Sequence, residues 1–239
     1  NVQASYERGG GILSVAGKLD WPRLLEQVTE LFDDWSAVPR EPLTTTSPLG
    51  GYEYIEFDSS QTQIAVAYPS VPYAHPDYFQ ARGAVGILSD GMSSRLFTEV
   101  REKRGLCYTV YASCHSLRDQ GSVLCYAGTS TERSQETLDV LLAELRRLPD
   151  GVEPAELQRL KARIKSSLIM QQESSASRSY AMASDWYHLG RVLTMDEVSS
   201  RIDALSCDTI NDYLRRNPPQ DFCVVTLGEK PLEVQLGVS

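Results

Sequence analysis

A change of hydrophobic period at Gly105 constrains the fold of this chain more than any other feature. Residues 91–111 read GMSSRLFTEVREKRGLCYTVY. Apolar residues recur at helical spacing before Gly105, whereas Leu106, Tyr108 and Val110 alternate as in a strand. Glycine is the usual residue just past a helix end. The segment therefore predicts a short helix that stops at Gly105 and passes directly into a strand.

The predicted helix is amphipathic and rich in positive charge. At steps of about 100° per residue, Leu96, Phe97 and Val100 form its apolar stripe. Arg95 lies on the far side, four residues before Glu99, which is a favourable spacing for an exposed ion pair.

Arg101 is the basic residue of this helix that local pairing leaves unexplained. Glu99 is spaced to pair with Lys103, and Lys103 and Arg104 fall in the last turn, where positive charge suits the helix dipole. Arg101 lies at the edge of the apolar stripe, with no acidic residue three or four positions away. Its five donors need acceptors. Two kinds of acceptor stay open: a remote carboxylate of the fold, or the carbonyls of an extended peptide near the hydroxyl of Tyr108.

The first part of the chain predicts a strand and a helix followed by a linker. Residues 11–17 predict a buried strand, and residues 20–35 predict a helix with Asp20 as its N-cap and Pro22 in the first turn. Residues 36–51 contain three prolines and a Thr/Ser run, as linkers do.

The rest of the chain predicts a mixture of strands and helices. Strands are expected at 52–57, 62–68, near 121–129 and at 221–229, and helices at 76–89, 132–148, 153–173, 176–189, 195–205 and 208–216. Thr194 and Glu197 have the spacing of a capping box.

Composition excludes several classes of function. A net charge of −9 disfavours binding to phosphate backbones, so no nucleic-acid partner is expected. No apolar run approaches the roughly 18 residues of a membrane span, so no membrane partner is expected either. The five cysteines are an odd number without a Cys-x-x-Cys pair, which favours free thiols in a reducing, cytoplasmic compartment.

Residues 91–113, followed by GSVLCYAGTS, resemble the C-terminal half of the insulinase/pitrilysin-like zinc metallopeptidases, which include the mitochondrial processing peptidase. The resemblance implies an α+β domain with a mainly antiparallel sheet and helices packed on one face. It also implies that Arg101 and Tyr108 hold the backbone of a peptide substrate. The resemblance also gives the domain limits. Residues 1–35 would be the closing strand and helix of a truncated metal-bearing domain, residues 36–51 would be a linker, and residues 52–239 would form the complete second domain.

The chain departs from that family at the metal centre. The family's inverted zinc motif, His-x-x-Glu-His, is absent, and His75, His115 and His188 lie far apart. Zinc is therefore expected in the full-length protein or a partner and not in this chain, which is not expected to be active alone. Cys114 and His115 are adjacent on a predicted strand and so point to opposite faces, which disfavours a site built from both.

Two functions stay open from the resemblance. The chain is either the substrate-gripping domain of a zinc peptidase that helps to close its catalytic chamber, or a non-catalytic peptide-binding or assembly subunit. Expected partners are an unfolded polypeptide and a metal-bearing N-terminal half or partner subunit; a homodimer stays open. Arg104 is an alternative to Arg101, and only the seven-residue spacing to Tyr108 in the family selects Arg101.

Overall fold

The computed structural model of this chain describes residues 11–33 and 50–235. These residues form two compact units, and the smaller contains residues 11–33 with 166–193. The larger contains the remaining described residues and carries the helix-to-strand segment. Within the described ranges, no helix is both long enough and apolar enough to cross a bilayer.

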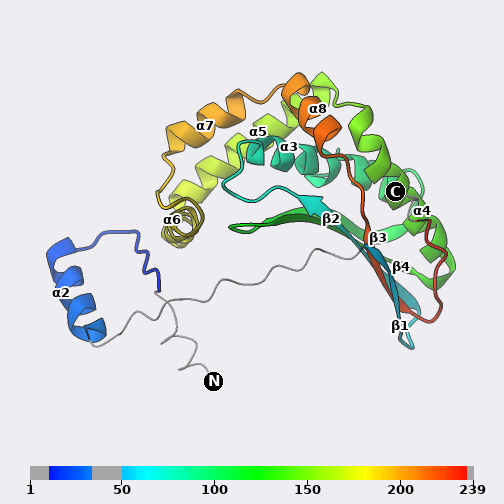
Figure 1. Cartoon of the computed structure of the whole chain (residues 1–239), viewed down its shortest axis with the longest axis horizontal. Helices are drawn as coiled ribbons and strands as arrows, with labels where there is room; N and C mark the ends of the chain where they lie inside the picture. The colour runs from blue at the N-terminus through cyan, green and yellow to red at the C-terminus, as the bar shows by residue number, and fades with distance from the viewer. Residues whose placement is uncertain (1–10, 34–49, 236–239) are drawn as a thin grey trace. The chain divides into compact units, whose positions relative to one another are not determined.

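A single five-stranded sheet forms the centre of the larger unit (Figure 1). Its strands, in chain order, are β1 (Gly51–Glu56), β2 (Gln61–Ser70), β3 (Cys107–Ser116), β4 (Gly121–Ser130) and β5 (Cys223–Gly228). In space they run β1-β5-β2-β4-β3, so that β1 and β3 are the edges. Only β1 and β5 pair in parallel, and the other neighbours are antiparallel. The expected mainly antiparallel sheet is confirmed.

Helices of this unit cover one face of the sheet, as α3, α4 and α8 show in Figure 1. The helices of the unit are α3 (Tyr78–Ser89), α4 (Ser134–Arg147), α7 (Met195–Asp203), α8 (Cys207–Arg216) and the first part of α5 (Pro154–Glu173). Short 3₁₀ turns at Thr131–Arg133 and Leu148–Asp150 flank α4. The α+β class with helices on one face is therefore confirmed.

The alternation of buried and partly exposed residues along a strand shows which face of the sheet the helices cover. In β2, Ile64, Val66 and Tyr68 are buried, whereas Ala65 and Ala67 between them are partly exposed. Successive strand residues point to opposite faces, so the first set packs under the helices and the second lies on the open face. The core is therefore on the helical side of the sheet.

In the larger unit, the elements predicted from periodicity are present, with ends that differ by a few residues. The Thr194 and Glu197 capping box is confirmed: the backbone N–H of Thr194 donates to Glu197 Oε2 at 2.9 Å, and that of Glu197 donates to Thr194 Oγ1 at 3.2 Å.

The smaller unit contains α2 (Trp21–Phe32), α6 (Ser175–Leu189) and the last part of α5. Asp20 is confirmed as the N-cap of α2, because its Oδ1 accepts a hydrogen bond from the backbone N–H of Arg23 at 3.2 Å.

The strand predicted at 11–17 is wrong. Residues 11–16 have no regular structure, and Ile12 and Leu13 are exposed. A strand requires a hydrogen-bonded neighbour, and none of the described residues pairs with this segment. Residues 36–49 of the expected linker lie outside the described residues, and the expected domain limits at 35 and 52 stay a prediction.

Candidate substrate-binding site

The segment after α3 forms the helix and strand that its sequence predicts, with one difference in helix type. A helix begins at Arg95 and continues as a π-helix over Phe97–Glu102, where the N–H of Lys103 reaches the carbonyl of Thr98 at 2.9 Å. The prediction of regular α-helical steps is therefore wrong here, since an i→i−5 bond fits an extra residue into the turn.

Gly105 ends this helix as predicted. Its φ is +58°, and its N–H donates to the carbonyl of Arg101 at 2.9 Å. Residues with a Cβ are strained at this φ, which is why glycine suits the position. The chain then enters β3 within two residues, and this places Tyr108 directly beside the end of the helix.

Arg95 does not form the predicted pair with Glu99. Its Nε and Nη2 donate to the two carboxylate oxygens of Glu156, both at 2.8 Å, and Nη2 also donates to the carbonyl of Gly151 at 2.6 Å. The side chains of Arg95 and Glu156 are only 12% and 15% exposed. The prediction failed because Glu156 comes from α5, and local spacing contains no information about a distant element.

Glu99 instead binds two other basic residues of the segment. Lys103 Nζ lies 2.7 Å from its Oε1, as predicted, and Arg104 Nη1 lies 2.9 Å from its Oε2 and 2.7 Å from its carbonyl oxygen. The hydrogen bonds from Lys103 and Arg104 lower the pKa of Glu99. Arg104 therefore has an internal partner, and this weakens it as an alternative to Arg101.

Arg101 contacts aromatic rings instead of carboxylates. Its guanidinium carbon lies 4.9 Å from the ring centroid of Phe97 and 5.7 Å from that of Tyr108. Both distances are within cation–π range. Among the residues that the structure describes, none forms a hydrogen bond or ion pair with the side chain of Arg101. The side chain is exposed, and its N–H donors are available to an outside acceptor.

Tyr108 lies at an irregular position on a free sheet edge. The β3–β4 register shifts between Cys107 and Thr109, so Tyr108 has no partner residue across the ladder. A bulge of this kind re-aims a side chain, and Tyr108 is 85% exposed. The two residues selected from the sequence thus lie together at one end of β3, with a guanidinium and a phenol facing solvent.

An aromatic pair on the open face was not predicted. Tyr111 and Tyr126 lie opposite each other on β3 and β4, with ring centroids 5.3 Å apart. Antiparallel pairing fixes such neighbours once the turn between two strands is known, so the short β3–β4 connection was the signal that could have found them. Tyr126 also donates a short hydrogen bond to Gln63 Oε1 on β2.

The described residues offer no fit for zinc, since no group of three or more His, Cys, Asp or Glu side chains converges there. His115 Nε2 lies 2.9 Å from Ser113 Oγ on the exposed side of β3, whereas Cys114 Sγ points to the carbonyl of Ala81 on α3. Cys114 and His115 thus point apart, as predicted. Burial raises the pKa of the Cys114 thiol to about 12, which makes it a poor nucleophile or ligand.

Sequence relatives of this chain are zinc proteases. One, an uncharacterized zinc protease of Rickettsia felis, is 27% identical over 210 residues, which are 87% of this chain and 51% of the relative. An uncharacterized zinc protease of Bacillus subtilis is 29% identical over 173 residues, which are 71% of this chain and 42% of the relative. The chain therefore spans about half the length of these relatives.

Solved structures share the fold. The peptidase M16 inactive domain from Pseudomonas fluorescens matches with a TM-score of 0.76 at 20% identity, over 92% of this chain and 53% of that one. A chain of complex III2 from Candida albicans matches with a TM-score of 0.75 at 20% identity, over 89% of this chain and 54% of that one.

A family model described as the peptidase M16 inactive domain matches residues 12–164, a range that includes the helix-to-strand segment and both residues of the candidate site. The chain therefore belongs to the peptidase M16 family, the insulinase-like zinc proteases, and contains its inactive C-terminal domain.

Proposed function

We propose that this chain is the substrate-gripping domain of a zinc peptidase, that it holds an extended polypeptide at Arg101 and Tyr108, and that it helps to close the catalytic chamber. Zinc and the catalytic base come from outside this chain, either from another part of the same protein or from a partner subunit. One observation carries the proposal: Arg95, Lys103 and Arg104 all bind internal carboxylates, whereas Arg101 is held by two rings and keeps its donors exposed.

The chemistry of this arrangement suits a peptide carbonyl. Stacking on Phe97 and Tyr108 orients the guanidinium without occupying its N–H groups. A pre-oriented donor loses less conformational entropy on binding. In the assembled peptidase, such donors also stabilise the negative charge that grows on the carbonyl oxygen during attack.

The position of Tyr108 supports the same function. β3 is an edge strand, and extended polypeptides bind proteins by adding to sheet edges. The relatives that are zinc proteases are about twice as long as this chain, which leaves room for a metal-bearing half in the complete protein.

A second candidate function is that of a non-catalytic subunit that binds peptides or supports an assembly. The match to a chain of complex III2 favours it, since that chain belongs to a multi-subunit complex. The residues encoded before Asn1 discriminate: a His-x-x-Glu-His motif there supports the peptidase, and its absence there and in partner subunits supports the second function.

Replacing Arg101 by alanine in the full-length protein tests the peptidase function. We expect kcat/KM on an unstructured fluorogenic peptide to fall about 10²-fold or more, the usual loss when one oxyanion donor is removed, with zinc content unchanged. Arg104→Ala is the matched control, because it removes the same charge from the turn that follows the same helix, but from a side chain bound to Glu99. Its effect on turnover should be small.

Tyr108→Phe tests the role of the hydroxyl separately from that of the ring, since it keeps the contact of the ring with Arg101 and removes only the hydroxyl. Unchanged turnover in both Arg101→Ala and Tyr108→Phe would refute a substrate-gripping site. If the wild-type assembly does not cleave peptides, the same variants are compared for peptide binding by fluorescence anisotropy. Loss of binding in Arg101→Ala but not in Arg104→Ala would then favour the peptide-binding subunit.

A further inference from the structure

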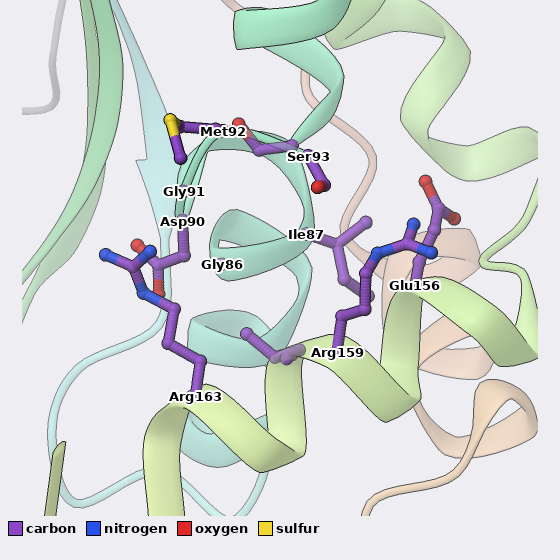
Figure 2. A pocket seen from close by; sticks show the side chains of 11 residues that line it. Gly86, Ile87, Asp90, Gly91, Met92, Ser93, Glu156, Arg159 and Arg163 are labelled. Atoms are coloured by element: carbon purple, nitrogen blue, oxygen red, sulfur yellow. The ribbon is translucent and has the colours of Figure 1, made fainter. Parts of the chain in front are cut away.

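A second site of the larger unit lies apart from Arg101 and Tyr108. It is a cavity of about 250 Å³ between the C-terminal end of α3, the loop that follows it and the first half of α5 (Figure 2). Neither Arg101 nor Tyr108 lines it. Sites for drug-sized ligands occupy about 300–1,000 Å³, so this cavity suits a small ligand.

Two guanidiniums line the cavity from α5. Arg159 and Arg163 are one helical turn apart, and Figure 2 shows their guanidiniums on opposite sides of the view, Arg163 toward Asp90 of the facing segment and Arg159 toward Glu156 of α5. Among the described residues, none forms a hydrogen bond or an ion pair within 4 Å with the side chain of either arginine. Arginine carries five donors and no acceptor, so the pair presents donors only.

The backbone at Gly91 allows Arg163 to come close. Gly91 has a φ of +100°, and a Cβ built there would lie 2.4 Å from Arg163 Nη1. Any side chain at position 91 would therefore displace the guanidinium. Glycine here is required both by the conformation and by the approach of Arg163.

Ser94, another residue that lines this cavity, has a buried hydroxyl. Ser94 is only 5% exposed, and within the described part of the chain its Oγ has no hydrogen-bond partner. Buried hydroxyls are nearly always satisfied, because an unpaired one costs free energy. A ligand atom in the cavity is one way to satisfy it.

The two carboxylates of the cavity do not cancel its positive charge. Glu156 already accepts two of the three hydrogen bonds that the Arg95 guanidinium donates. The charge of Arg159 also acts on Glu156 and helps to lower its pKa, so Asp90 is the carboxylate of the cavity that faces Arg163. Burial raises the pKa of Asp90, while the charges of Arg163 and Arg82 act to lower it. The balance of the cavity is thus positive, with Asp90 as the group that competes for Arg163.

We propose that this cavity binds a small oxyanion, a phosphate or a carboxylate group, between the guanidiniums of Arg159 and Arg163, with the hydroxyl of Ser94 as a further donor. Arginine matches the geometry of both groups, since its N–H fork can donate two parallel hydrogen bonds to two oxygens of either. The proposal stands independently of the peptide-gripping function.

Isothermal titration of this chain with inorganic phosphate, N-acetylglycine and N-acetylglycinamide tests the proposal. The first two probes distinguish phosphate from carboxylate, and the amide lacks the charge of the acid. We expect saturable binding of phosphate, of the acid or of both, and none of the amide. Arg159→Gln and Arg163→Gln should each weaken binding about tenfold or more, because a charge-assisted hydrogen bond is lost.

Two further variants distinguish specific binding in the cavity from a general effect of the net charge of the protein. Arg118→Gln removes an exposed arginine from the β3–β4 turn and should change nothing. Asp90→Asn removes the competing carboxylate and should tighten binding several-fold, an effect that loss of a structural role would not produce. Far-UV circular dichroism verifies that each variant is folded.

Absence of saturable binding by both anions would overturn the proposal, as would equal weakening in Arg118→Gln. Binding that persists at full strength in both Arg159→Gln and Arg163→Gln would overturn it as well. Since Arg163 also lies over Gly91, Arg159→Gln is the decisive variant if Arg163→Gln disturbs the fold.

Discussion

Replacing Arg95 by alanine should destabilise the larger unit more than the loss of any exposed ion pair. The guanidinium makes three hydrogen bonds, two to Glu156 and one to the carbonyl of Gly151. With 12% and 15% of the two side chains exposed, the pair is largely removed from water. Truncation leaves a carboxylate in this environment without its main partner.

The expected loss of stability is about 3 kcal/mol. Removing one member of a buried pair costs roughly 3–5 kcal/mol, and the lower end applies because Glu156 also faces a cavity that admits water. Lys103→Ala is the matched control, since Lys103 pairs with Glu99 at 2.7 Å but is 60% exposed. Exposed pairs contribute about 0.2–1 kcal/mol.

The difference between wild type and Arg95→Ala should depend on pH in a fixed direction. Burial acts to raise the pKa of Glu156, but the hydrogen bonds and charge of Arg95 outweigh it, with help from the N–H of Glu153, and the pKa is lowered. A lowered carboxyl pKa contributes stability above the unfolded value of about 4.3 and loses it as the pH falls through the folded value. The difference should therefore shrink in acid.

Urea unfolding followed by far-UV circular dichroism measures this effect. Tryptophan fluorescence would report on the wrong unit, because Trp21 and Trp186, the tryptophans among the described residues, both belong to the smaller one. A loss below about 1 kcal/mol, equal to that of an exposed pair, would refute the argument from burial. A difference that grows toward acid pH would refute the assignment to Glu156.

Two other predictions concern the backbone and the thiols. Gly105→Ala should cost about 1 kcal/mol in urea unfolding, since a Cβ there has room but the φ of +58° is strained; a neutral substitution would contradict this. Burial raises the pKa of Cys114 to about 12 and that of Cys125 further. In the folded chain, iodoacetamide at about pH 8 should therefore leave both unmodified by peptide mass spectrometry, while unfolded chain reacts. Rapid labelling of the folded chain would contradict this.

Local interactions are what the sequence by itself determined. The N-cap at Asp20, the capping box at Thr194 and the helix stop at Gly105 each involve residues within a few positions of one another. Strand alternation and helical period located the elements of the larger unit for the same reason. The proximity of Arg101 and Tyr108 also followed, because a tight glycine turn joins their helix and strand.

Tertiary structure decided which distant carboxylates pair with the basic side chains. Arg95 is bound by Glu156, 61 positions along the chain, and no helical spacing encodes that contact. The π-turn and the bond of Arg104 to Glu99 both join residues five positions apart, a spacing that the regular helical steps assumed from the sequence do not include. The apolar run at 11–17 also depends on tertiary contacts. Its residues suit a strand, but they do not form one because none of the described residues pairs with them. The sequence singled out Arg101 because it lacks a local partner. Pairing with a distant residue is a property of assembled elements, so only the fold showed that no carboxylate of the described residues pairs with its side chain.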